Sequence, residues 1–290
     1  MARARTLTIA YTPDSDDAFY YFGLEAGRVR LPGFRPEFCR EPMSVLNRAA
    51  LDGRFDVTAI SSVLYPRVAD RYAILSAGTS VGRGYGPVLV SKAPYRLTDL
   101  GGRPVGVPGV PTTGWFLLRR LCPEAVTVEM PFDHIGGAVA AGEIDAGVMI
   151  HEELLYYPRL GLRRVADLGA EWCRRHGLPL PVGLNIIRRD LGEGTTQAVC
   201  AAIRMSLRAA RRQKDEALAW VSRFGRGAEG KCTVPFVEMF ANEDSVRMPA
   251  DVRRALGVLL AQVAAMGAGP VVPQIDIIEG ASRAVSKLAC

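Results

Sequence analysis

The sequence predicts an α/β protein built as two lobes around a central cleft. Three observations support this fold class. Strand-like and helical stretches alternate over the first two-thirds of the chain, a short motif occurs twice, and two extended runs flank the segment that holds its second copy. The length of 290 residues is about twice that of an average domain, which agrees with two lobes.

The alternation of strands and helices begins near the N-terminus. Strands are predicted at 7–11, 56–61, 86–91, 104–107, 125–130 and 145–150, and helices at 17–26, 44–51, 115–121 and 135–141. Strands that alternate with helices of this length are typical of parallel α/β layers.

The last third of the chain is predicted to be mainly helical, with helices at 195–212, 215–224 and 250–266. The first of these helices is amphipathic, and we interpret its basic face as exposed to solvent. The two faces are formed by Val199, Ile203, Leu207 and Ala210 and by Arg204, Arg208, Arg211 and Arg212.

The repeated motif places polar residues after two strands. In both copies a helix ends at a glycine, an aspartate three residues later opens a strand, and a polar side chain follows that strand. Ser61 and Ser62 follow the first strand, and His151 follows the second. Ligands of open α/β sheets bind beyond the carboxyl ends of the strands. We therefore expect these three residues to face one another across a cleft between similar lobes.

The two extended runs, at 85–90 and 181–187, are each introduced by glycine and proline. If both cross between the lobes, the segment between them is inserted into the first lobe, as in a hinged clamp. The predicted lobe 1 then consists of residues 1–87 and 188–290, and the predicted lobe 2 consists of residues 88–187.

The loop between the first strand and the first helix is acidic and reads TPDSDDAF over residues 12–19. Ser15 or Asp16 could cap the helix, and the carboxylates complement the helix dipole. The same loop could line the mouth of the cleft, where Asp16 would accept hydrogen bonds from ligand hydroxyls. Both interpretations stay open on the sequence.

A glycine-rich turn at 106–115 follows another strand and opens another helix. Thr112 and Thr113 stand at the start of that helix, where free backbone N–H groups and the helix dipole favour an anion. A carboxylate suits this site better than a triphosphate because the phosphate-binding pattern G-x-x-x-x-G-K-[ST] is missing. The run GRGYG at 82–86 has the wrong spacing for a dinucleotide loop, and a strand follows it.

His151 is the histidine best placed for chemistry, because a lone histidine in a cleft suits general acid or base work near neutral pH. Zinc is not expected, since Leu155 stands where H-E-x-x-H would have its second histidine. The six cysteines are scattered without C-x-x-C spacing. We therefore predict neither a metal nor a cofactor.

Seven motifs occur along this chain in a fixed order. They are Thr12 to Phe19, Gly53-x-x-Asp56 to Tyr65, Gly82-Arg83-Gly84-x-Gly86-Pro87, Val107-Pro108-Gly109-x-x-Thr112-Thr113, Met149-Ile150-His151-Glu152, Tyr157-Pro158-Arg159-x-Gly161-Leu162 and Gly177-Leu178-Pro179-Leu180-Pro181. In this combination the chain resembles the 1,4-dihydroxy-6-naphthoate synthases, enzymes of the futalosine route to menaquinone. The resemblance covers about residues 7 to 224.

The resemblance implies the type II periplasmic-binding-protein fold, with two lobes joined by two crossover strands. It also implies a cofactor-free lyase that splits cyclic dehypoxanthinyl futalosine into 1,4-dihydroxy-6-naphthoate and a three-carbon hydroxyketone. By similarity, His151 would be the general base. Ser61, Thr112 and Thr113 would bind hydroxyl or carboxylate oxygens of the substrate.

The first loop departs from the family pattern. The family commonly reads Pro-x-Pro-Asn-Asp-Thr-Phe, whereas this chain has Asp16 in place of the asparagine and Ala18 in place of the threonine. An ionised Asp16 only accepts hydrogen bonds, and it would repel a substrate carboxylate. We therefore expect the carboxylate to lie near Thr112, or the substrate to be a related but altered molecule.

A second class of function fits two lobes and a cleft equally well, namely a binding protein that closes on a small carboxylated ligand without chemistry. No apolar segment resembles an export signal or a membrane span, which predicts a cytoplasmic location and no membrane partner. The net charge of +6 is not gathered in basic runs interleaved with aromatic residues, so we expect a small-molecule substrate and no nucleic acid. Nothing in the sequence defines an oligomeric state.

Overall fold

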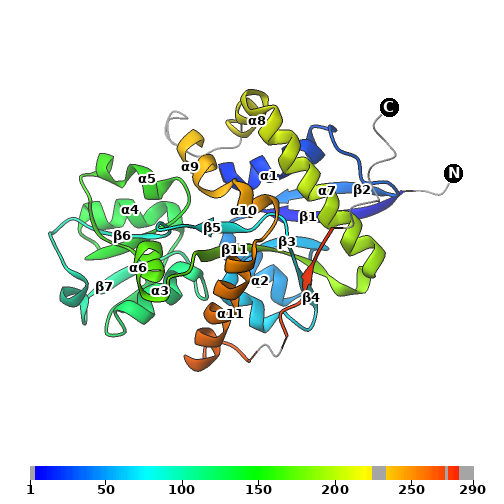
Figure 1. The fold of residues 1–290 in the computed structure, drawn as a ribbon. Helices are drawn as coiled ribbons and strands as arrows, with labels where there is room; N and C mark the ends of the chain where they lie inside the picture. The colour runs from blue at the N-terminus through cyan, green and yellow to red at the C-terminus, as the bar shows by residue number, and fades with distance from the viewer. Residues whose placement is uncertain (1–3, 224–232, 272–273, 281–290) are drawn as a thin grey trace.

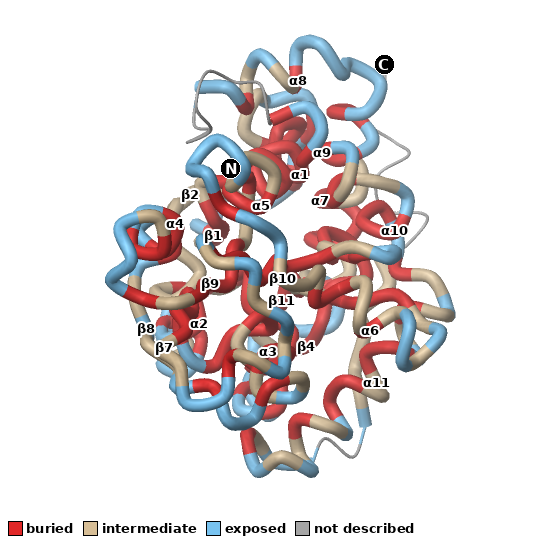
Figure 2. The backbone as a smooth tube through the Cα atoms, turned by 90° about the vertical axis from the view of Figure 1, so that its left-hand side faces the viewer, coloured by how far each residue is buried: buried red, intermediate tan, exposed pale blue. Residues whose placement is uncertain are grey.

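The computed structural model describes residues 4–223, 233–271 and 274–280. Two α/β lobes lie side by side, each built on its own sheet (Figure 1). Buried segments run through both lobes (Figure 2). Among the described residues, no helix combines the length and apolar character needed to cross a membrane.

The larger sheet has the strand order β12-β4-β11-β3-β1-β2, and β5 pairs with β11. β1 runs parallel to β2 and β3, while β11 runs antiparallel to β3, β4 and β5. The strands are β1 (Arg5–Tyr11), β2 (Phe34–Arg40), β3 (Val57–Ser61), β4 (Tyr72–Leu75), β5 (Ser80–Gly82), β11 (Leu180–Arg188) and β12 (Ile277–Ile278).

The smaller sheet has the order β10-β6-β9-β7-β8. β7 runs parallel to β8 and β9, and β6 runs antiparallel to β9 and β10. The strands are β6 (Val88–Ser91), β7 (Pro104–Val107), β8 (Val126–Glu129), β9 (Ala146–Met149) and β10 (Arg163–Asp167). The expectation of parallel layers is thus correct for one side of each sheet, β3-β1-β2 and β9-β7-β8. In contrast, β11 and β6, the strands next to the two crossings, run antiparallel to their neighbours.

The helices pack around these sheets (Figure 1). α1 and α7 lie so close that a Cβ on Gly23 would approach the Cα of Ser206 to 2.7 Å. The helices are α1 (Ser15–Glu25), α2 (Met43–Leu51), α3 (Thr113–Leu121), α4 (Phe132–Ala141), α5 (Glu153–Tyr156), α6 (Leu168–His176), α7 (Glu193–Arg212), α8 (Lys214–Val221), α9 (Thr233–Phe240), α10 (Glu243–Val246) and α11 (Ala250–Ala265).

The chain passes from the larger to the smaller sheet between β5 and β6 and returns through β11. At the first crossing the backbone of residues 85–86 lies against α6, where a Cβ on Gly169 would be 2.1 Å from the carbonyl oxygen of Tyr85. Only glycine permits this approach. The whole of β11 belongs to the larger sheet, whereas our lobe boundaries place residues up to 187 in lobe 2, and those boundaries stay a prediction.

The basic face predicted on α7 is only partly exposed, and our interpretation is wrong for Arg204. Its guanidinium donates to Oγ of Ser76 at 3.0 Å and lies 3.6 Å from the carboxylate of Glu279. Arg208 and Arg212 are exposed as expected. The difference arises because the segment around β12 packs beside α7. The predicted helix at 215–224 ends at Val221, and residue 224 lies outside the described residues.

Candidate active site

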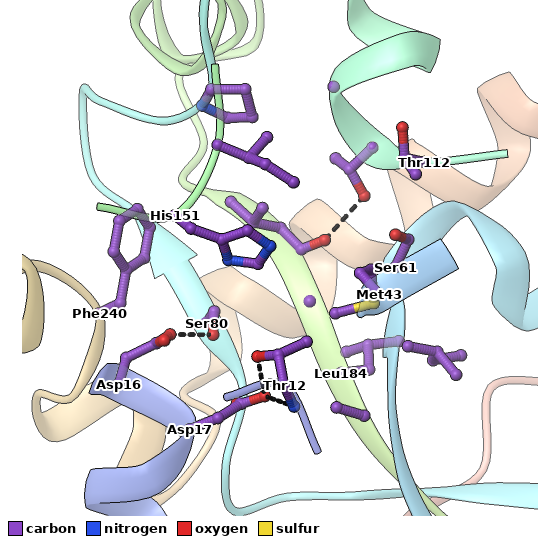
Figure 3. Close-up of a pocket in the computed structure, with 18 of the residues that line it drawn as sticks. Thr12, Asp16, Asp17, Met43, Ser61, Ser80, Thr112, His151, Leu184 and Phe240 are labelled. Carbon is purple, nitrogen blue, oxygen red and sulfur yellow. Dashed lines mark hydrogen bonds between the residues drawn. The ribbon is translucent and has the colours of Figure 1, made fainter. Parts of the chain in front are cut away.

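A cavity opens between the two sheets, with an empty volume of about 710 Å³ including its open mouth. Both lobes contribute to it: α1, α2, β3, β5 and β11 on the side of the larger sheet, and the start of α3, the segment after β9 and α5 on the side of the smaller (Figure 3). Phe236 and Phe240 of α9 complete the wall. The wall is mainly apolar. Its polar side chains are Thr12, Asp16, Asp17, Ser61, Ser80, Thr112, Thr113, His151 and Asn185.

His151 follows β9 and reaches the cavity as the sequence predicts (Figure 3). Among the described residues it is the only non-glycine residue with a positive φ, 55°. Such a conformation costs about 1–3 kcal/mol and is found most often at functional sites. The imidazole Nδ1 lies 2.6 Å from Oδ2 of Asp14, and the rings of Phe132 and His151 pack in a T-shaped arrangement. Nε2 is buried and has no hydrogen-bond partner among the described residues.

The pKa of His151 reflects two opposing effects. Burial alone would lower it, because a charged imidazolium is poorly solvated inside the protein. The negative charge of Asp14 outweighs burial and, together with the two glutamates that follow the histidine, raises the pKa to about 9. His151 is therefore a stronger base than an ordinary histidine.

Glu152 joins the two lobes at the start of α1. Its Oε1 accepts hydrogen bonds from the backbone N–H of Ser15 at 2.9 Å and from Oγ of Ser15 at 2.5 Å. The N-cap position of α1 is held by Asp14, whose side chain makes no capping hydrogen bond. The expected cap by Ser15 or Asp16 is therefore wrong, because a carboxylate from the other lobe takes that place.

Asp16 and Asp17 line the cavity from the first turn of α1 (Figure 3). Oδ2 of Asp17 accepts from the backbone N–H and the hydroxyl of Thr12, at 3.0 and 2.7 Å. Oδ2 of Asp16 accepts from Oγ of Ser80 at 3.0 Å.

Burial raises the pKa of Asp16 well above its ordinary range, and the charges of Asp17 and Asp14 raise it further. The neutral carboxylic-acid form of Asp16 is therefore favoured more strongly than in an ordinary aspartate. Our expectation that it only accepts hydrogen bonds assumed an ionised group, but a neutral acid can also donate one.

Ser61 ends β3 and lines the cavity, whereas Ser62 does not. Asn47 holds Ser61 in place: it accepts from the Ser61 N–H at 3.0 Å and donates to Oγ of Ser61 at 3.2 Å. The same amide donates to the carbonyl of Pro111 in the other lobe at 3.0 Å. Ser62 begins a 3-10 turn and is fully buried, so the structure does not bring it into the group that faces the cleft.

Thr112 and Thr113 line the cavity, but their hydroxyls already donate to protein atoms. Thr112 Oγ1 donates to the carbonyl of Gly109 at 2.9 Å and caps α3 by accepting from the Trp115 N–H at 3.3 Å. Thr113 Oγ1 donates to the carbonyl of Val182 at 2.7 Å. The first-turn N–H groups of Thr113 and Gly114 have no partner within the helix. The donors available to an anion here are therefore backbone amides.

The predicted site residues do not include four polar side chains that line the cavity, Thr12, Asp17, Ser80 and Asn185. They also do not include Asp14, Glu152 and Asn47, which contact residues of the site or of the first loop. Asp14 and Glu152 lie beside predicted residues in the sequence, but nothing in their spacing indicates that they meet other residues across the lobes. No sequence signal identifies Asn47. Among the described residues, no group of three or more histidine, cysteine, aspartate or glutamate side chains is arranged to hold a metal ion.

Two lobes with a cleft between them define the class of this protein. Its structure is similar to the alkanesulfonate-binding protein SsuA from Xanthomonas axonopodis pv. citri, with a TM-score of 0.69 and 14% identity over 96% of this chain and 98% of that one. This confirms the predicted periplasmic-binding-protein fold, and at such low identity it shows the fold alone.

Comparison at higher identity leads to the family. The model of the menaquinone biosynthesis family matches residues 7–265. A 1,4-dihydroxy-6-naphthoate synthase from Thermus thermophilus is 39% identical over 90% of this chain and 95% of its own length, and one from Streptomyces coelicolor is 33% identical over 92% and 96%. The crystal structure of protein AF1704 from Archaeoglobus fulgidus has a TM-score of 0.86 and 39% identity, over 90% of this chain and 98% of that one.

The chain thus belongs to the menaquinone biosynthesis family and is an enzyme of that process. The resemblance noted from the sequence motifs is confirmed.

Proposed function

We propose that this enzyme is a 1,4-dihydroxy-6-naphthoate synthase of the futalosine route, which releases that product from cyclic dehypoxanthinyl futalosine. The names of the relatives support the product. The observation that carries the chemistry is that His151 lines the cavity and that its buried Nε2 has no hydrogen-bond partner among the described residues, while Nδ1 of the same imidazole lies 2.6 Å from a carboxylate.

In this proposal His151 is the general base. A base must reach the proton that it removes, and its strength follows its pKa. Nε2 accepts a proton from the substrate, and the electron pair left on the substrate drives cleavage of the carbon–carbon bond. The raised pKa of His151 favours this transfer once the free imidazole is present.

Other groups of the cavity bind the substrate in this proposal. The N–H groups of Thr113 and Gly114 take the carboxylate, because the dipole of α3 favours negative charge there. Ser61 contacts a hydroxyl. Asp16 donates a hydrogen bond to the substrate as a neutral acid. In this way it replaces the amide donor of the asparagine that is common in the family.

The experiment is a mass spectrum of cyclic dehypoxanthinyl futalosine incubated with purified protein, with neither metal nor nucleotide added. We expect the dihydroxynaphthoate and a three-carbon hydroxyketone. His151→Gln should lower turnover at least ~100-fold, the usual contribution of a general base, while product binding measured by fluorescence is retained.

His176→Gln is the matched control, because His176 packs on Trp172 outside this cavity. It should keep full activity. Full activity in His151→Gln would refute the assigned base. Tight binding of the substrate by the wild-type protein without product would favour the alternative of a binding protein.

A further inference from the structure

The Asp14 carboxylate contacts His151 and not the first turn of the helix that Asp14 precedes. An aspartate at the N-cap of a helix normally accepts a hydrogen bond from a first-turn N–H. Asp14 occupies the N-cap of α1 with extended dihedrals, φ −91° and ψ 160°, yet its carboxylate makes no such bond. It lies instead against Nδ1 of His151, at 2.6 Å.

This contact is the main interaction of a buried charge. Asp14 is 1% exposed, and neither carboxylate oxygen has a hydrogen-bond partner among the described residues. A buried carboxylate without compensation costs several kcal/mol. The position is therefore hard to explain by stability alone, and the imidazole is the group that compensates it.

Asp14 and His151 come from different lobes. Asp14 stands between β1 and α1 on the larger sheet, and His151 follows β9 of the smaller sheet. The neighbouring residues Ser15 and Glu152 meet in the same place and fix the approach of the two segments.

We propose that Asp14 is the positioning residue of His151: it holds Nδ1 of the imidazole so that Nε2 faces the substrate as the base. This inference rests on the proposed lyase function. When the imidazole is neutral and its remaining proton sits on Nδ1, beside the Asp14 carboxylate, Nε2 is unprotonated. When Nε2 takes the substrate proton, the adjacent Asp14 side chain stabilises the imidazolium.

Around His151 and Asp14, the described residues place no second cation that could pair with Asp14 in place of the imidazolium. Carboxyl groups face it from two sides: Asp14, Asp16 and Asp17 from the α1 segment, and Glu152 and Glu153 from its own segment. On the α4 side the neighbour is the uncharged ring of Phe132. The ion pairs of the described residues bring neither arginine nor lysine to these carboxyls.

The test is a direct titration of His151 by NMR in protein carrying ¹³C-labelled histidine. The chain has three histidines, so the variants His134→Gln and His176→Gln assign the signals. In wild-type protein we expect a midpoint near 9. In Asp14→Asn the midpoint should fall to 6.5 or below. Burial still lowers the pKa of His151, and the largest negative charge that raises this pKa is gone. The proton affinity of His151 thus drops at least ~300-fold, since each pKa unit is a factor of ten.

Kinetics supply a second readout. In the wild type kcat should rise with pH towards 9, because the base must lose its proton. In Asp14→Asn this rise should move to lower pH, and the plateau should fall at least ~10-fold because the ring is no longer oriented. Asp14→Glu restores the charge and should restore the high midpoint.

Asp167→Asn is the matched control. Asp167 is also an N-cap aspartate, but it caps α6 by accepting from the Ala170 N–H, and asparagine is an equally good cap. It should change neither midpoint nor kcat.

The outcomes separate the two proposals because the titration needs no turnover. Equal midpoints in wild type and Asp14→Asn would overturn the role of Asp14, whether or not the protein is a lyase. A midpoint near 9 that falls in Asp14→Asn, in a protein without lyase activity, would support the pairing and overturn the proposed function.

Discussion

Asp17 offers a quantitative test of the acidic cluster, through the variant Asp17→Asn. Burial raises the pKa of Asp17 from 3.8 to about 6, although the hydrogen bonds from Thr12 oppose this. The folded protein therefore holds this proton more tightly than the unfolded chain does. The resulting stability is fully present below pH 3.8 and is lost as the pH rises through 6. At about 1.4 kcal/mol for each tenfold difference in proton affinity, the loss is about 3 kcal/mol.

Asparagine keeps the shape and the acceptor oxygen of Asp17 but does not ionise. We therefore expect Asp17→Asn to match wild type near pH 4 and to exceed its free energy of unfolding by up to ~3 kcal/mol at pH 7.5. The assay is urea denaturation of both proteins at the two pH values.

The control for this experiment is Asp215→Asn, an exposed aspartate in the first turn of α8. It should leave the pH dependence unchanged. The reasoning would be refuted if Asp17→Asn were no more stable than wild type at pH 7.5, or if its stability fell with pH as steeply as that of wild type.

Three further predictions concern the cavity wall. Asp16→Asn should keep kcat/KM within ~3-fold of wild type near pH 7, because a neutral acid and an amide both donate and accept hydrogen bonds. A loss above tenfold in the lyase assay would show that the charge of Asp16 matters. Gly114→Ala places a Cβ 2.8 Å from Cγ1 of Val148, so thermal unfolding should reveal a loss of about 1–3 kcal/mol, and unchanged stability would contradict this close packing. Thr113→Val removes the donor to the Val182 carbonyl and should lower the free energy of unfolding by about 1–3 kcal/mol. Urea denaturation measures this change. An unchanged free energy of unfolding would mean that water replaces the hydroxyl.

The fold was largely predictable because its signals are local. Apolar runs and glycine-terminated helices mark β1, β3, β7 and β9 within a few residues. β2 was not predicted, since its sequence FRPEFCR mixes charges and a proline at a sheet edge. The direction of β11 was also not predictable, because it depends on where the chain crosses between the lobes.

The candidate site was predictable only where a strand end determines a position. His151 and Ser61 follow strands and line the cavity. The repeated motif also predicts Ser62 at the cleft, because it follows the same strand. However, β3 ends at Ser61, and a 3-10 turn directs the next residue into the core. The roles of Asp14 and Glu152 depend on contacts between residues 137 positions apart, and a single sequence carries no signal of such pairs.

The hydrogen bond from the Ser15 N–H to Glu152 has a consequence for measuring how the lobes move. The first N–H groups of a helix normally exchange with solvent freely, because they lack an intrahelical acceptor. Here the amide at the first position of α1 has an acceptor on the opposite lobe. Its hydrogen-exchange rate therefore reports the fraction of molecules in which the lobes are apart. One backbone amide, followed by deuterium exchange without added substrate, thus serves as a probe of lobe opening.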